Sequence, residues 1–308
     1  MTAVTAGRTR ATASLRHRLA ERGIDLSLLM LLPALLLVIA LFIYPFSYGI
    51  GLTFQPTPAT QTQWGGGILA NYLAFFKDPF VSTSVWLTMR LALPAALFNV
   101  AASVPMAFKL RVHFRGKKLL TTLLVLPITL GTVLTAQGLL IFAGRQGWLN
   151  RFLILIGVIH EPLQLVNNVV GVFLSLVISG FPFAFLLISS YLSGIDPSIE
   201  AAAKTMGARW GQRFLRVVLP LLAPGLATTF ILTFVLAFSV FPSARLVGDA
   251  TGATRVMALM AYRAFGEQTD YPMASTIALM MGVVELVVIA LVLLWRSSLY
   301  KGSSGGKG

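Results

Sequence analysis

The chain has 308 residues, of which 56% are hydrophobic and only 11% are charged. Soluble globular domains carry roughly 25% charged residues, so this composition excludes a water-soluble protein and indicates a lipid bilayer as the solvent. The sequence contains no cysteine, which excludes a disulfide scaffold, a thiolate metal site and a cysteine nucleophile.

Six apolar blocks are long enough to cross a bilayer, which takes about 20 residues per helix. The first block follows a basic segment, residues 1–25, and is too long for the apolar part of a signal peptide. We therefore expect an uncleaved membrane anchor at this position. The predicted fold is an all-α integral membrane protein with six transmembrane helices, at 26–48, 84–108, 119–142, 168–192, 221–241 and 272–295.

The distribution of Lys and Arg predicts the orientation of these helices. With the N-terminus inside, the cytoplasmic segments hold 17 of the 24 basic residues and the outer loops hold six. This bias places both termini in the cytoplasm, across a bacterial inner membrane. The net charge of +14 is then a topology signal and a contact for membrane lipids, not a nucleic-acid footprint. The predicted units are a basic cytoplasmic segment 1–25, a membrane domain 26–298 and a disordered cytoplasmic tail 299–308.

The loop between the fourth and fifth spans, residues 194–220, carries the strongest local signals. Asp196 can cap a helix that begins at Pro197, where the missing N–H costs nothing. Gly207 can supply a left-handed residue that ends this helix. A second helical piece follows and is expected to end at Pro220 at the membrane boundary. It carries an aromatic and aliphatic stripe and a basic stripe, namely Trp210, Phe214 and Val217, and Arg209, Arg213 and Arg216.

This loop resembles the EAA motif of the permease subunits of binding-protein-dependent ABC importers. The alignment puts Ala202 and Ala203 on the two alanines and Gly207 on the glycine, with Leu219-Pro220 further on. Ala201 then stands where the motif has glutamate, and Glu200 lies one position earlier. The alternative interpretation of 194–220 is a basic interfacial helix pair. The resemblance extends over roughly residues 28–298 and includes four further motifs: Asn71-Tyr72, Asp78-Pro79, Gly147-Trp148-Leu149-Asn150 and Phe181-Pro182-Phe183.

The resemblance implies a type I importer permease with three kinds of partner. These are an ABC ATPase subunit dimer that receives the coupling loop, a second permease subunit in a homo- or heterodimer, and an extracytoplasmic solute-binding protein. The coupling residues it implies are Glu200, Ala201, Ala202, Ala203, Gly207, Arg209, Leu219 and Pro220. The stretch that begins at Asp270-Tyr-Pro-Met resembles permeases of the spermidine/putrescine type. Iron(III), aminoethylphosphonate, thiamine and sugar remain alternative substrates.

Polar residues inside the spans are candidates for a translocation path. They are Asn99, Thr129, Thr132, Gln137 and Glu285. Each has an alternative role, since polar side chains also form hydrogen bonds between membrane helices, and a glutamate in a span can be packed in a neutral form. Arg90, near an outer helix end, is expected to extend its side chain to the interface.

The sequence carries no phosphate-binding loop of the Gly-x-x-x-x-Gly-Lys-Ser/Thr type and no His-Glu-x-x-His zinc motif. Enzyme activity is therefore not expected, the chain needs no cofactor or metal of its own, and ATP with Mg²⁺ must be bound by a partner ATPase. Two other classes of function stay open: an ion-driven secondary transporter, which would need no ATPase, and a scaffold membrane protein, which would carry no flux.

Overall fold

The computed structural model describes residues 26–112, 115–249 and 251–300, apart from the side chains of residues 26–30, 64 and 298–300. The basic segment 1–25 and residues 301–308 of the expected tail lie outside the described residues. All regular elements within the described ranges are helices, as the apolar composition predicts.

Six helices are long and apolar enough to cross a membrane, which confirms the six predicted spans. The ends of the helices differ from the prediction by a few residues, because each span continues past its most apolar part to a cap or a turn. The final helix also extends into the expected tail. The spans are α2 to α3 (Leu26–Val38 and Tyr44–Thr53, joined by the π-helical turn Ile39–Ile43), α6 (Pro79–Leu110), α7 (Lys117–Ala143), α9 (Val169–Ser193), α12 (Leu219–Phe238) and α15 (Tyr271–Tyr300).

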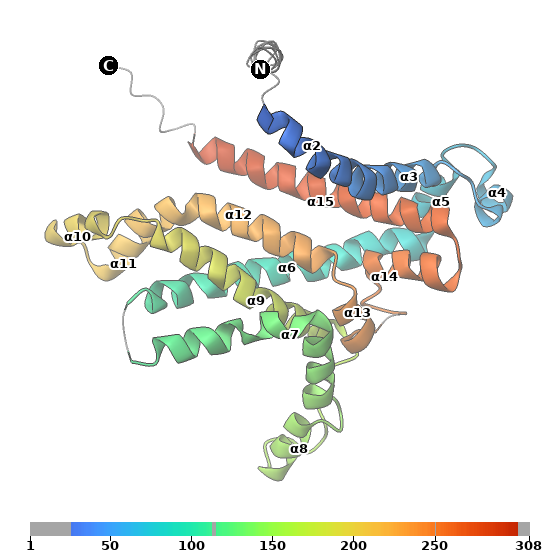
Figure 1. The fold of residues 1–308 in the computed structure, drawn as a ribbon. Helices are drawn as coiled ribbons and strands as arrows, with labels where there is room; N and C mark the ends of the chain where they lie inside the picture. The colour runs from blue at the N-terminus through green and yellow to red at the C-terminus, as the bar shows by residue number, and fades with distance from the viewer. Residues whose placement is uncertain (1–25, 113–114, 250, 301–308) are drawn as a thin grey trace, which may run out of the picture.

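Three of the spans form the centre of the molecule. Helix α6 packs against both α9 and α12, and α9 also packs against α12 (Figure 1). In the most apolar stretch of each helix, 50% of the residues of α6, 39% of α9 and 44% of α12 are buried. The corresponding share is 6% for α7, 6% for α15 and 0% for the first span. The single chain therefore has a packed core of three helices and three spans with largely uncovered surfaces.

Shorter helices connect the spans. On the side opposite α10 (Pro197–Thr205) and α11 (Trp210–Arg213), the chain forms α4 (Pro58–Trp64) and α5 (Ala70–Lys77) (Figure 1). The connection between α12 and α15 contains α13 (Pro242–Val247), α14 (Met257–Tyr262) and a π-helical turn (Arg263–Glu267). Met257 of α14 is fully buried, and its N–H donates to Thr88 Oγ1 of α6 at 2.9 Å. This connection is thus part of the core rather than a surface loop.

Two π-helical turns explain how helices continue through proline. A proline within a helix loses one hydrogen bond and its ring collides with the carbonyl four residues earlier. That carbonyl belongs to Leu41 for Pro45 and to Arg216 for Pro220, and both residues lie inside a π-helical turn. The wider turn moves the carbonyl away from the ring, so the helix is not interrupted.

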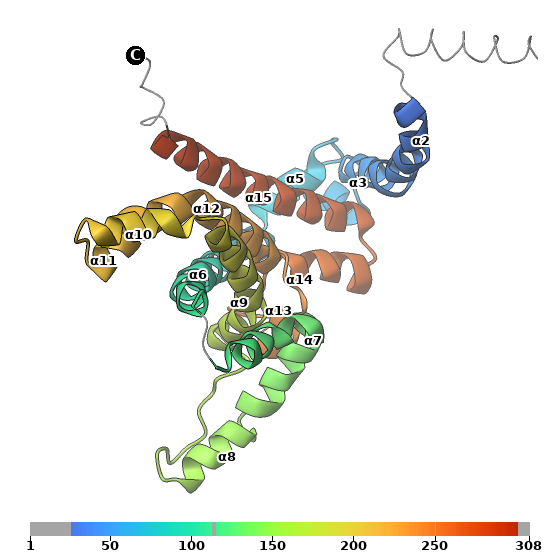
Figure 2. The same cartoon turned by 60° about the vertical axis from the view of Figure 1, so that its left-hand side comes forward.

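Helix α7 is divided by a true break. Gly131 has φ 72° and ψ 169°, a conformation that lies outside the helical region and favours glycine. Pro127, one turn earlier, weakens the helix before this point. The Thr135 hydroxyl donates to the Gly131 carbonyl at 2.8 Å and so satisfies one backbone group near the break. After the break α7 turns away from the bundle and leads to α8 (Trp148–Leu155), which projects from the body (Figure 2).

Candidate functional site

The coupling segment begins with the helix that the sequence predicts. Asp196 has an extended backbone and its carboxylate accepts a hydrogen bond from the Ser198 N–H at 2.8 Å, while Pro197 occupies the first helical position. That hydrogen bond lowers the pKa of the Asp196 carboxyl below its usual value. The cap and the proline together define where α10 starts.

Helix α10 ends as predicted, at a left-handed glycine. Gly207 has φ 82°, and the turn is closed by the Gly207 N–H to the Lys204 carbonyl at 3.0 Å and the Ala208 N–H to the Ala203 carbonyl at 3.1 Å. A Cβ at Gly207 would meet no atom within 4 Å, so the backbone angle alone requires glycine. The turn therefore has space for a side chain at Gly207, but its backbone angle favours glycine.

The second helical piece differs from the prediction at its end. We expected Pro220 to end it at the membrane boundary, and this is wrong. Helix α11, the π-helical turn Phe214–Val218 and α12 form one continuous helix from Trp210 to Phe238. The wide turn accommodates Pro220, so α11 is a rigid extension of the fifth span rather than a separate helix lying on the membrane surface.

The predicted coupling residues do not all face the same way. Ala203 is buried, with 5% of its surface exposed, whereas Ala201, Ala202 and Arg209 are exposed. Met206 and Trp210, on either side of the Gly207 turn, expose 80% and 59% of their surfaces. The exposed tip of the segment thus combines two large apolar side chains with Lys204 and Arg209, and it lies at the end of the molecule to which the sequence assigns the cytoplasm (Figure 1).

Glu200 points into the protein instead of toward this tip. Its carboxylate lies 3.5 Å from Arg111 Nη1 and 3.5 Å from Arg213 Nη1. Arg111, at the end of α6, also donates from Nη2 to the Ile195 carbonyl at 2.6 Å. Arg111 was not among the predicted site residues, because a basic residue near a predicted cytoplasmic helix end already satisfies the positive-inside pattern.

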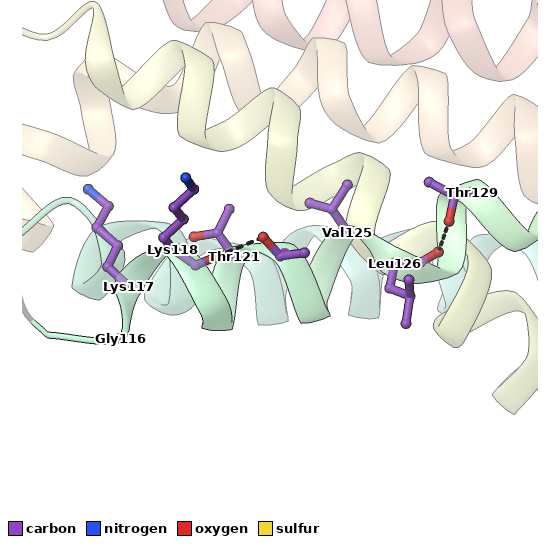
Figure 3. Close-up of a pocket in the computed structure, with 8 residues that line it drawn as sticks. Gly116, Lys117, Lys118, Thr121, Val125, Leu126 and Thr129 are labelled. Carbon is purple, nitrogen blue, oxygen red and sulfur yellow. Dashed lines mark hydrogen bonds between the residues drawn. The ribbon is translucent and has the colours of Figure 1, made fainter.

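An open cavity runs along the first half of α7 (Figure 3). Its volume is about 720 Å³, and its lining combines two lysines, three threonines and apolar side chains. The Thr129 hydroxyl donates to the Leu126 carbonyl within α7 at 2.7 Å. The lining consists of Gly116, Lys117, Lys118, Thr121, Thr122, Val125, Leu126 and Thr129.

The five predicted path residues are not brought together. Thr129 lines the cavity, Thr132 is exposed beyond the Gly131 break, and Gln137 is half-buried in the outer half of α7. Asn99 is 1% exposed and donates to the Leu176 carbonyl of α9 at 3.3 Å, which supports the interhelical alternative for this residue.

Two charged residues of the spans, Glu285 and Arg90, do not line the cavity along α7. Glu285 is half-buried on α15 and has no ion-pair partner among the described residues. Arg90 is exposed on α6, as expected for a side chain that reaches toward the interface. No three His, Cys, Asp or Glu side chains group as metal ligands in the described part of the chain.

A buried asparagine, Asn150, organises the connection after α7. It is fully buried, donates to the carbonyls of Gly144 and Leu163, and accepts from the Leu163 N–H, all within 2.8 to 2.9 Å. The sequence placed Asn150 in a motif but did not reveal this role, because its partner lies 13 residues further along the chain.

These features define a class: a multi-pass helical membrane protein with a projecting segment between its fourth and fifth spans and an open, polar-lined helix face. Residues 99–302 match the family of binding-protein-dependent transport system inner membrane components. The chain belongs to this family, which comprises membrane permease subunits of ABC importers and not enzymes.

Individual relatives transport different solutes. The chain is 30% identical over 152 residues to the spermidine/putrescine transport system permease protein PotB of Haemophilus influenzae, covering 49% of this chain and 53% of that protein. The match thus spans about half the length of PotB. The identity to the probable sulfate transport system permease protein cysT of Prototheca wickerhamii is 33% over 217 residues, covering 70% of this chain and 83% of cysT.

The fold is also that of a solved importer. A bacterial ABC transporter involved in the import of the acidic polysaccharide alginate superposes with a TM-score of 0.75 at 19% identity, covering 93% of this chain and 99% of that chain. At this level of identity the likeness concerns the fold alone.

Proposed function

We propose that the chain forms half of a translocation path through the inner membrane and couples it to ATP hydrolysis by a separate ABC ATPase dimer. The observation that carries the proposal is the projection formed by α10, the Gly207 turn and α11, which exposes Met206 and Trp210 at its tip and is continuous with the fifth span. An ATPase that moves this projection moves α9 and α12 with it, because both are joined to the segment 194–220.

Alternating access is the mechanism that we propose. ATP closes the ATPase dimer, the projection moves, and the path opens outward, where a solute-binding protein releases its ligand. The binding protein must then influence ATP turnover as well, since coupling between two sites is reciprocal. Both termini lie in the cytoplasm in this proposal, in agreement with the excess of basic residues on that side.

A second permease subunit is the proposed cover of α7. Only 6% of the apolar stretch of this helix is buried within the chain, and many exposed side chains are large and apolar, including Leu126, Leu134 and Phe142. A second permease subunit, identical or related, would cover this surface and enclose the cavity that Thr121 and Thr129 line. The first span, whose apolar stretch has no buried residue within the described structure, contacts membrane lipids.

Two substrate classes are proposed. A polyamine or related small organic amine is supported by the similarity to PotB. An anionic solute is supported by one specific observation: the cavity along α7 is lined by Lys117 and Lys118 and by no carboxylate. A polycation would meet repulsion there, whereas an anion would be attracted, so the geometry favours the anion. The similarity to cysT, which extends over more of both chains, points the same way.

Substitution of Gly207 by Val tests the coupling role. The expected result is loss of co-purification with the ATPase and loss of ATP-driven uptake, with membrane insertion unchanged, because Val does not tolerate φ 82° and the turn must rearrange. Gly65→Val is the matched control: Gly65 has φ 78°, also has free space for a Cβ, and lies at the opposite end of the molecule.

Normal ATP-driven uptake by the Gly207→Val protein would contradict the proposal, and uptake by vesicles without ATP would favour an ion-driven transporter instead. Competition by sulfate or by spermidine for uptake of the solute carried by the binding protein distinguishes the two substrate classes.

A further inference from the structure

Glu200 is the meeting point of three elements that are far apart in the sequence. Its carboxylate belongs to α10, Arg111 ends α6 and Arg213 belongs to α11. The side chain of Glu200 is 22% exposed, as is that of Arg111, and Arg213 is 18% exposed. We call Glu200, Arg111 and Arg213 the ion triad.

The triad has features that an ordinary surface ion pair lacks. One carboxylate serves two guanidinium groups, and Arg213 Nε is buried without a partner in the described structure. Removal of the carboxylate charge would leave two partly buried arginines close to one another, which is unfavourable. A single exposed pair, in contrast, contributes little to stability.

A second contact joins the same elements. Phe108 of α6 lies edge-on to Phe214 and to Trp210, with ring centroids 5.1 and 5.9 Å apart, and the two rings of the coupling segment stack on each other at 6.0 Å. The cytoplasmic end of α6 is therefore attached to the coupling segment by charge and by aromatic packing, although α6 is not adjacent to that segment in the chain.

Arg111 connects the triad to the candidate path. It lines a cavity of about 260 Å³ together with Lys117 and Thr121 of α7. Both of these α7 residues also line the larger cavity along that helix. The residue that holds Glu200 is thus part of the wall at the mouth of the path.

We propose that Glu200 is a positioning residue that makes α10 and the cytoplasmic end of α6 move as one body. Movement of the coupling segment then reaches the mouth of the path through α6 as well as through α9 and α12. The inference rests on the proposed coupling function and adds to it a third, non-covalent connection. Glu200 acts within the chain, while the exposed Ala201, Ala202 and Met206 remain available to the ATPase.

The absence of cysteine from the sequence allows a direct test with pairs of spin labels. The first pair, at Lys109→Cys and Lys204→Cys, measures the distance between the end of α6 and α10; both positions are exposed. The second pair, at Leu35→Cys and Lys204→Cys, measures the movement of α10 relative to the first span, which is not part of the three-helix core; Leu35 is also exposed. Distances are recorded on the complete importer in lipid nanodiscs, without nucleotide and after trapping with ATP and vanadate.

In the parent protein the first distance should stay constant between the two states while the second changes. Glu200→Gln should broaden the first distance distribution and reduce the stimulation of ATP hydrolysis by the binding protein about fivefold. Arg111→Gln should have the same kind of effect, and the double variant should lose less than the sum of the two single losses, because both substitutions remove the Glu200–Arg111 ion pair. Glu267→Gln, which removes the carboxylate of the Arg263 ion pair in the connection between α14 and α15, is the control.

A Glu200→Gln complex with a narrow, constant first distance and full stimulation would overturn the proposed positioning role. A parent complex whose second distance does not respond to nucleotide would instead overturn the proposed coupling function. Insertion of the Glu200→Gln chain is checked by its yield in the purified complex, and the charge-conserving Arg111→Lys supplies a variant with minimal risk to folding. Arg111→Lys should broaden the first distance less than Arg111→Gln, and equal broadening would contradict a role for the charge.

Discussion

The three-helix core and the α7 face show two different ways of placing polar groups in a membrane helix. In the core, hydroxyl groups are buried and satisfied locally: Thr233 donates to the Thr229 carbonyl at 2.8 Å and Thr88 to the Ser84 carbonyl. Along α7, Thr121 and Thr129 line an open cavity. The same residue type is therefore enclosed in one helix and faces an open cavity in the other, and burial by neighbouring helices makes the difference.

The largest expected effect comes from the core. Phe234 of α12 is fully buried between its neighbours Phe230 and Phe238, so Phe234→Ala leaves a cavity and should destabilise the chain by about 3 kcal/mol. Phe142→Ala on α7, where the residue is 46% exposed, should change the unfolding midpoint of the isolated chain little. Thermal unfolding in detergent measures the change in the unfolding midpoint of both variants. Equal changes would contradict the distinction between the buried core and the exposed face of α7.

Two glycines, one in the core and one on α7, allow the same comparison with a single added methyl group. A Cβ at Gly180 of α9 would lie 2.4 Å from Asn99 Nδ2, so Gly180→Ala should displace this buried amide and cost about 1 to 3 kcal/mol. Gly138→Ala on α7 meets no atom within 4 Å and should be neutral or slightly stabilising in the isolated chain. The same unfolding assay checks them; a tolerated Gly180→Ala would show that Asn99 is not firmly held.

The exposed face of α7 gives an effect that is confined to the assembled importer. A single cysteine in place of Leu134, which is 55% exposed, should react readily with a maleimide in the isolated chain and several-fold more slowly in the complex. Reaction at Leu35→Cys, on the first span, is the reference for a lipid-facing position. Equal labelling of Leu134→Cys in both preparations would contradict a second permease subunit on this face.

The smallest expected effect concerns the cap of α10. The folded pKa of Asp196 lies below its unfolded value of about 3.9, so its contribution is present above that pH and is lost as the pH falls through the folded pKa. The protection of the amides of residues 197–206 against hydrogen exchange, relative to their intrinsic exchange rates at each pH, should therefore be unaffected by this group between pH 7 and pH 5. It should decrease only at lower pH. Asp196→Asn, which can still cap the helix, should remove the acid-dependent part; an Asp196→Asn protein with unchanged acid sensitivity would contradict the assignment.

Local signals in the sequence predicted much of this structure correctly. The six spans follow from the length of each apolar block, and the start and end of α10 follow from Asp196, Pro197 and Gly207. These features depend on the bilayer and on single-residue backbone preferences, which act in the same way wherever the segment lies in the fold. The prediction failed at Pro220, where a π-helical turn compensated for the proline.

Contacts between distant segments were not accessible in this way. Asn99 appeared as a path residue and is a contact between α6 and α9, and the role of Asn150 depends on a backbone group 13 residues away. Arg111 looked like one more cytoplasmic basic residue until the fold placed it beside Glu200. For each of these residues the chemistry of the side chain was evident, but its partner was not.

By itself, the sequence determined that the chain spans a membrane six times, with a capped and hinged segment between the fourth and fifth spans, because apolar length and backbone preference act residue by residue. The tertiary structure alone decided which polar side chains are enclosed and which line the open face of α7. It also decided that Glu200 faces two arginines instead of the exposed tip. These outcomes depend on which helices lie against each other, since a side chain is buried, paired or open only in relation to its neighbours in space.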